Sequence, residues 1–142
     1  MISSFKGEHR FLSNFWPCQV EYEGYVYPSV EHAYVSAKIS CTSEERKELN
    51  AILAQMTAGQ AKKFGKELPL REDWNVVRLS IMQELLLQKF NDPELKAKLL
   101  ATGDKELVEG NTWGDKFWGV CDGEGSNHLG RLLMRIRSLL QS

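Results

Sequence analysis

The sequence predicts an α+β fold: a single domain over residues 1–142 that is mainly α-helical and has a small N-terminal antiparallel β-hairpin. Three observations lead to this prediction. Apolar residues recur at helical spacing in several separate segments. Between Cys18 and Tyr27, apolar and polar residues alternate instead, which is the period of a strand. The chain of 142 residues has no internal repeat, low-complexity tract or Pro/Ser-rich linker, so one domain is expected.

Composition and charge narrow the class of protein. A hydrophobic fraction of 42% and a charged fraction of 26% are ordinary for a globular protein. The net charge of -1 argues against a protein that follows nucleic acid through many phosphate contacts, although it allows a local site for a phosphorylated ligand. Cys18, Cys41 and Cys121 are odd in number and lack CxxC spacing, which favours free thiols. With no signal peptide or membrane-spanning run, we expect a cytoplasmic protein without a membrane partner.

The N-terminal segment is predicted to be a buried loop followed by the hairpin. Residues 5–17 are dense in large apolar side chains that Ser and Asn interrupt. A buried Asn must be hydrogen-bonded, so Asn14 either fixes this loop or binds a ligand. Strands over 18–22 and 25–27 are expected to flank a turn at Glu23-Gly24.

A short helix after Ser29 contains a carboxylate, an imidazole and an ammonium group. Ser29 is the expected N-cap, and Glu31 lies in the first turn, where the positive helix end favours an ionised carboxylate. Lys38 follows seven residues after Glu31, on the same side of the helix. Glu31 either only complements the helix dipole or stabilises positive charge on a substrate and orients a water molecule.

Five further helices are expected from cap signals and helical periodicity. The signals are Thr42, Thr57, Asp73, Asp92 and Asn127. Gly65 is expected to end the second of these helices. Apolar residues around most of the circumference of 74–90 predict a central, largely buried helix. Near Gly65 there is a group of cations that is either a solvated face or a site for one or two phosphates: Lys62, Lys63, Lys66 and Arg71.

Residues 110–125 combine many glycines with two tryptophans. Glycine at this density is costly unless the backbone needs unusual dihedrals or close approach. Asp115 lies between Trp113 and Trp118, an arrangement that suits stacking a base or binding a sugar. In the alternative, the tryptophans cover the core and Asp115 caps a turn.

Several common chemistries have no motif in the sequence. The phosphate-binding loop, the dinucleotide fingerprint and the GxSxG elbow are missing. His9, His32 and His128 lack zinc-ligand spacing, so neither a metal nor a cofactor is expected. The remaining acids, aromatics and cations suit glycosidic-bond hydrolysis and a nucleotide-binding module equally well.

Five separated blocks resemble the NADAR superfamily, the YbiA-like proteins. They lie in order at residues 7–15, 27–34 with Lys38, 70–74, 110–119 and 127–137. The resemblance implies a compact, mainly helical fold with a small β component. It also implies an N-glycosidase that hydrolyses a bond between ribose C1′ and a nitrogen. The implied substrates are ADP-ribosylated guanine, in nucleic acid or nucleotides, and phosphorylated intermediates of riboflavin synthesis.

The resemblance also implies roles for individual residues. Glu31 would be the main catalytic carboxylate, and Asp115 would assist as acid/base or by orienting ribose. The implied substrate-binding residues are Asn14, Phe15, His32, Lys38, Arg71, Trp74, Trp113, Trp118, Gly119 and Asn127. Many relatives have Gln-Ala where this chain has Val35-Ser36, which leaves substrate choice more open than the chemistry.

We therefore expect a hydrolase that removes ADP-ribose from guanine in DNA, RNA or a nucleotide. The alternatives are a hydrolase of phosphorylated riboflavin intermediates, a non-catalytic ADP-ribose or nucleotide reader, and a structural domain that binds no nucleotide. The joint presence of Glu31 and Asp115 favours an enzyme, since two acids beside an anionic ligand oppose binding. The near-neutral charge predicts that any DNA contact is local and involves a flipped-out base.

Overall fold

The structure is a computed structural model that describes residues 1–141. Contacts between residues divide the chain into two compact units. The central unit is Asn14–Lys89, and the terminal unit consists of Met1–Ser13 and the chain from Phe90 onward. The single domain over 1–142 stays a prediction.

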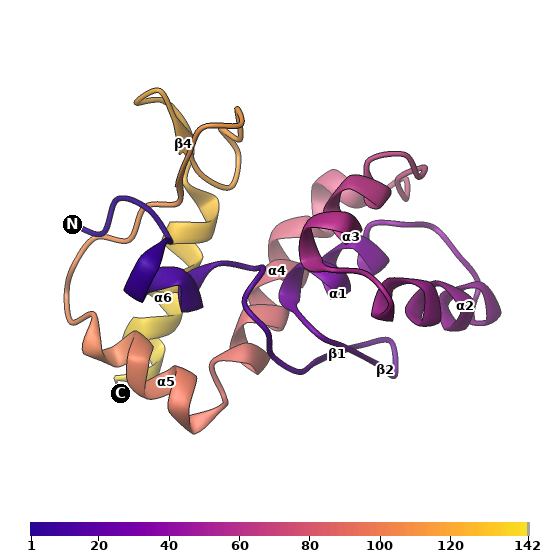
Figure 1. Cartoon of the computed structure of the whole chain (residues 1–142), viewed down its shortest axis with the longest axis horizontal. Coiled ribbons are helices and arrows are strands. Elements are labelled where there is room, and N and C mark those ends of the chain that lie inside the picture. Colours follow the sequence, from indigo (N-terminus) through magenta and orange to yellow (C-terminus); the bar gives the residue numbers. More distant parts are fainter. Residues whose placement is uncertain (142) are drawn as a thin grey trace. The chain divides into compact units, whose positions relative to one another are not determined.

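The central unit begins with the β-hairpin and continues with four helices (Figure 1). Strands β1 (Val20–Tyr22) and β2 (Tyr25–Tyr27) pair antiparallel, as predicted. Glu23 and Gly24 between them have φ of 51° and 85°, because a tight two-residue turn needs positive φ at both positions. The helices are α1 (Val30–Ala37), α2 (Ser43–Ala54), α3 (Ala58–Gly65) and α4 (Trp74–Lys89).

Helix α1 is the core of the central unit. All eight of its residues are buried, and it packs against α2, α3, α4 and both strands. Capping signals fix where these helices begin: Ser29 caps α1, and complete capping boxes start α2 at Thr42 and α3 at Thr57. These three predicted helix starts are confirmed.

Helix α4 differs from its prediction in one respect. It starts at Trp74, but its circumference is not largely buried, because the Val76 side chain is 83% exposed and Leu79 and Leu87 are exposed as well. The buried side chains, among them Met82 and Leu86, lie on one face. Helix α4 has more apolar side chains than its contacts with α1 and β1 cover.

Gly65 is the last residue of α3, so the predicted end of this helix is confirmed. Its φ is not positive, and Lys66 follows as the C-cap in right-handed conformation. A Cβ at this position would lie 2.8 Å from Val35 Cγ1 and 3.0 Å from Lys38 Cε. Gly65 therefore allows α3 to approach α1 closely.

The terminal unit contains short elements around two longer helices. Residues 7–12, predicted to be irregular, form the 3₁₀ helix η1 (Gly7–Leu12), whose Phe11 and Leu12 are buried. Helix α5 (Pro93–Ala101) starts as predicted, with the Asp92 carboxylate accepting from Leu95 N, and it packs against α6 (His128–Leu140). Strands β3 (Gly110–Asn111) and β4 (Val120–Cys121) form a short parallel ladder that the sequence did not predict.

Asn127 precedes α6 but does not cap it, which corrects the prediction. Its backbone is left-handed (φ 55°), and its side chain makes no capping bond. Instead, Asn127 Oδ1 accepts from Glu109 N (3.0 Å) and Nδ2 donates to Leu107 O (3.0 Å). The side chain thus joins the start of α6 to the segment before β3. None of the helices within residues 1–141 is both long and apolar enough to cross a membrane.

Candidate active site

Glu31 lies in the first turn of α1, and its position is determined on two sides. Ser29 Oγ accepts a hydrogen bond from His32 N (3.1 Å), which fixes the start of the helix. The Glu31 amide donates to the backbone oxygen of Asn14 (3.1 Å), so the preceding loop is attached at the same point. Glu31 is only 8% exposed. A buried carboxylate at the positive end of a helix is suited to stabilising positive charge on a bound group.

His32 uses both ring nitrogens within the protein. Nε2 donates to Met56 O (2.8 Å), which leaves Nδ1 as the acceptor of the Ser29 hydroxyl (2.6 Å). The buried ring therefore connects the start of α1 to the end of α2. This geometry gives His32 a structural role, and its predicted contact with substrate remains a prediction.

Lys38 follows α1 as its C-cap and is half-buried. Burial lowers the pKa of its amine, the Glu31 carboxylate partly opposes this, and the charges of Lys66 and Lys62 lower the pKa further. The side chain runs past Gly65, which leaves room for it. Glu31 and Lys38 thus form an interacting acid and amine on one helix, with two more lysines of the α3 region near them.

Asn14 and Phe15 lie at the beginning of the central unit. Asn14 Nδ2 makes a weak contact of 3.6 Å with Met82 Sδ, while Oδ1 is buried and has no hydrogen-bond partner. Phe15, predicted to be buried, is 39% exposed, and the Lys62 ammonium lies 5.9 Å from the centre of its ring. Both roles predicted for Asn14, fixing the loop and binding a ligand, stay predictions.

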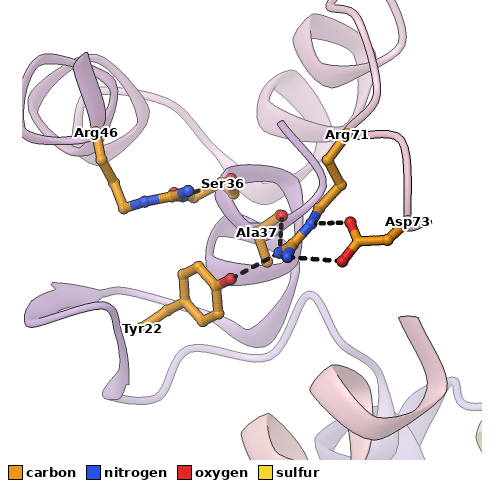
Figure 2. Close-up of polar contacts among 6 residues, drawn as sticks. All are labelled: Tyr22, Ser36, Ala37, Arg46, Arg71 and Asp73. Atoms are coloured by element: carbon orange, nitrogen blue, oxygen red, sulfur yellow. Dashed lines mark hydrogen bonds and ion pairs between the residues drawn. The ribbon is translucent and has the colours of Figure 1, made fainter. Parts of the chain in front are cut away.

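Trp74 and Arg71 have well-defined partners in the central unit. Trp74 is buried at the start of α4, with its ring 5.0 Å from that of Tyr34. Arg71 donates to both carboxylate oxygens of Asp73, to the Tyr22 hydroxyl and to Ala37 O (Figure 2). The guanidinium of Arg71 is therefore occupied within the protein. The charges that shift the pKa of Lys38 are those of Glu31, Lys66 and Lys62. Arg71 thus has less capacity for a phosphate than the sequence suggested.

Asp115 is part of the terminal unit, where it organises the loop between β3 and β4. Its Oδ1 accepts hydrogen bonds from the amides of Phe117 (3.1 Å) and Trp118 (2.9 Å). Asp115 therefore caps a turn, which was the structural alternative in the sequence analysis. Its catalytic role stays a prediction, and the turn determines where its carboxylate lies.

The other predicted residues of the terminal unit surround this loop. Trp118 is half-buried and packs edge-on against Phe117 (4.8 Å between ring centres), whereas Trp113 is 56% exposed. A Cβ on Gly119 would collide with the Glu109 backbone oxygen, so glycine is needed for the close approach of these two segments. Trp118 is thereby held by its neighbours, while Trp113 lies at the surface.

Two residues that hold the structure together, Asn111 and Arg46, were not predicted from the sequence. Asn111 is buried and makes four hydrogen bonds that close the loop: to Asp115 O, to the Glu109 carboxylate, to Glu109 O and from Asp115 N. Arg46 is buried on α2, where its spacing from Leu49 and Leu53 places it on the apolar face and was the available signal.

The predicted residues thus divide between the two units. Glu31 and His32 lie in the first turn of α1, Lys38 caps its end, and Asn14 is bonded to its start. Asp115, Trp118, Gly119 and Asn127 belong to the terminal unit. In residues 1–141, no group of three or more His, Cys, Asp or Glu side chains is arranged to hold a metal ion.

The protein has a mainly helical fold with a small hairpin. Its buried helix α1 carries an acid in its first turn and is capped by a lysine. These features match the class of protein that the sequence resemblance implies. The NADAR domain model matches residues 3–141. The chain therefore belongs to the NADAR family.

Two curated relatives and one solved structure are similar to most of this chain. A riboflavin biosynthesis protein of Vibrio vulnificus is 41% identical over 138 residues; the match covers 94% of this chain but only 36% of that relative. The N-glycosidase YbiA of Escherichia coli is 37% identical over 133 residues, covering 91% of this chain and 80% of YbiA. The NMR structure of E. coli YbiA has a TM-score of 0.80 at 31% identity, covering 99% and 87% of the two chains. The predicted mainly helical fold with a small β-hairpin is confirmed.

Proposed function

We propose that this protein is an N-glycosidase that hydrolyses the bond between ribose C1′ and a base nitrogen. The observation that supports it most is Glu31, a buried carboxylate at the start of a buried helix, which interacts with the half-buried amine of Lys38. The similarity to E. coli YbiA, a protein named as an N-glycosidase, supports the same class of reaction.

The proposed chemistry uses the Glu31 charge directly. As the C1′–N bond breaks, the ribose ring gains positive charge, which a nearby carboxylate stabilises. A water oxygen then bonds to C1′, one water proton goes to the departing base nitrogen through an acid/base group, and the base leaves neutral. Glu31 can orient this water. The products are a ribose with a hydroxyl at C1′ and the base with its nitrogen unmodified, which stays in the oligonucleotide when the substrate is a nucleic acid.

Lys38 and the α3 lysines have different properties in this proposal. Because burial lowers the Lys38 pKa, its amine exchanges a proton more readily than an exposed lysine, which suits proton transfer beside Glu31. Lys66 is exposed and Lys62 is half-buried near Phe15, so both remain suited to binding a phosphate group. Phe15 offers a partly exposed aromatic face for a base or sugar.

The proposed substrate is ADP-ribosylated guanine, in nucleic acid or as a nucleotide. It contains the C1′–N bond, two phosphates and an aromatic base, and therefore matches the acid, the lysines and the aromatic side chains. A second candidate is a phosphorylated intermediate of riboflavin synthesis. The 41% identity to a riboflavin biosynthesis protein of V. vulnificus favours that candidate.

A product assay separates these proposals. The protein is incubated with an ADP-ribosylated guanine oligonucleotide and, separately, with a phosphorylated riboflavin precursor, and the products are identified by mass spectrometry. Release of ADP-ribose from the first supports the proposed substrate, and release of ribose phosphate only from the second makes the protein a metabolite hydrolase. Binding of ADP-ribose in calorimetry without any release would contradict the enzyme and support a reader.

A further inference from the structure

The C-terminal end of α1 is bonded to two arginines (Figure 2). The last carbonyl groups of a helix lack partners within the helix. Here Ser36 O accepts from Arg46 Nη1 (2.7 Å), and Ala37 O accepts from Arg71 Nη1 (3.4 Å). The next carbonyl oxygen, that of Lys38, accepts from the Arg71 backbone amide (2.9 Å). Three successive carbonyl groups are therefore satisfied by two residues outside α1.

Arg46 reaches this position from α2 and is only 8% exposed. Its Nη1 also donates to Ser36 Oγ (2.9 Å), and that hydroxyl is hydrogen-bonded to the Tyr27 hydroxyl (2.7 Å). In the described part of the chain, Arg46 forms no ion pair with a carboxylate. Its charge lies instead at the negative end of the α1 dipole and 5.0 Å from the centre of the Tyr22 ring. This arrangement explains why a buried guanidinium is tolerated.

Arg71 is oriented by Asp73 and shares Tyr22 with Arg46. Its Nε and Nη2 donate to the two Asp73 oxygens at 2.6 Å and 3.2 Å, a forked pair that fixes the plane of the guanidinium. The remaining Nη1 donates to the Tyr22 hydroxyl (3.2 Å) as well as to Ala37 O. The two arginines, Tyr22 and the end of α1 thus form one connected network.

We propose that Arg46 and Arg71 are positioning residues that fix the C-terminal end of α1 and thereby determine where Lys38 places its amine relative to Glu31. The proposal rests on the N-glycosidase function proposed above. Helix α1 has only about two turns, so a displaced end changes the separation of Glu31 and Lys38. Lys38 is the residue most directly affected, because it directly follows Ala37, whose carbonyl accepts from Arg71 Nη1.

The Lys38 amine provides a readout that needs no substrate. The charges that act on it are those of Glu31, Lys66 and Lys62, and burial is the main cause of its lowered pKa. A change of the Lys38 pKa after substitution of Arg46 therefore reports that the amine has moved relative to these groups.

The experiment compares Arg46→Met and Arg46→Lys with Lys47→Met, an exposed cation on the same helix. The Lys38 pKa is measured by NMR titration of the free protein, and kcat and KM are measured on the substrate identified by the product assay. In Arg46→Met we expect the Lys38 pKa to rise towards 10.5 and kcat to fall about 10- to 100-fold, with a smaller change in KM. Arg46→Lys restores part of both, and Lys47→Met changes neither.

A double mutant separates positioning from general destabilisation. If Arg46 acts through Lys38, Arg46→Met lowers kcat no further in a Lys38→Met background. Fully additive losses, or an unchanged Lys38 pKa in a folded Arg46→Met protein, would overturn the proposal. The Arg71 side chain is 28% exposed, so Arg71→Gln provides the same test if Arg46→Met does not fold. If the wild type releases neither ADP-ribose nor ribose phosphate in the product assay, the function proposed above fails, while the titration still decides whether the arginines position Lys38.

Discussion

The orphan oxygen of Asn14 predicts that one substitution will separate stability from binding. Asn14 Oδ1 is buried and has no hydrogen-bond partner, and the Nδ2 contact with Met82 Sδ is long at 3.6 Å. A buried acceptor without a partner costs about 1–3 kcal/mol. A protein that retains such a group in its free form gains from it only when a ligand supplies the missing donor.

The perturbation is Asn14→Leu, which replaces the amide with an apolar group of similar size. It removes the unsatisfied oxygen and loses only the weak contact with Met82, so the free energy of unfolding should stay constant or rise by about 1 kcal/mol. For a chain of this size, that rise corresponds to an increase in Tm of about 3 °C. The backbone bond from Glu31 N to Asn14 O does not depend on the side chain and is expected to persist.

The assays are urea unfolding of the ligand-free protein and calorimetric titration with ADP-ribose. We expect Asn14→Leu to weaken ADP-ribose binding about tenfold, the loss of one hydrogen bond, while stability is kept. Asn50→Leu is the matched control, because the Asn50 amide donates to Val26 O (2.9 Å). The control should lose some stability and bind ADP-ribose normally. A loss of more than about 1 kcal/mol of stability in Asn14→Leu, or unchanged binding, would refute the reasoning.

Three further substitutions test other parts of the structure. Asp115→Asn can keep both amide bonds through its side-chain oxygen. If Asp115 is catalytic, kcat should fall about 10- to 100-fold with little change in Tm. Unchanged turnover would show that Asp115 only caps the turn. In Gly65→Ala, the new Cβ would lie 2.8 Å from Val35 Cγ1 and should lower the free energy of unfolding in urea by about 1–3 kcal/mol. This loss exceeds the roughly 1 kcal/mol that alanine gains in helix propensity. A more stable variant would contradict this packing. Burial lowers the pKa of Lys89 from 10.5 to about 7. Between these pH values the unfolded state therefore binds more protons than the folded state. The stability of the wild type should rise there with pH, by up to about 1.4 kcal/mol per pH unit. Lys89→Met should flatten that rise, and an equal slope in both proteins would show that Lys89 is not its source.

Local signals in the sequence were enough to predict the elements whose ends are decided by neighbouring residues. Ser29 and the capping box at Thr42 each act within one helical turn, so α1 and α2 begin where expected. The hairpin was predictable for the same reason, because its turn residues and alternation are adjacent in the sequence. The acid and amine of α1 followed from helical spacing alone.

Residues whose partners are distant in the sequence could not be assigned in this way. Asparagine is a residue type favoured at the N-cap, but the side chain of Asn127 is bonded to Glu109 and Leu107 instead. Gly65 ends α3 as predicted, but its close approach to Val35 on another helix could not be predicted from the sequence. The spacing of Arg46 from Leu49 and Leu53 places it on the apolar face of α2, but its bond to Ser36 could not be predicted. In each case the contact partner belongs to another segment of the chain.

The most direct test of the central claim compares turnover and binding in Glu31→Gln. Glutamine keeps the size of the side chain and removes its charge, and the helix start fixed by Ser29 should remain. Glu44→Gln, an exposed acid in the first turn of α2, is the matched control. We predict that Glu31→Gln binds substrate within a few-fold of the wild type and loses at least about 1,000-fold in kcat, or about 4 kcal/mol of barrier, while Glu44→Gln remains active. Near-normal turnover in Glu31→Gln would contradict the assignment of Glu31 as the catalytic carboxylate.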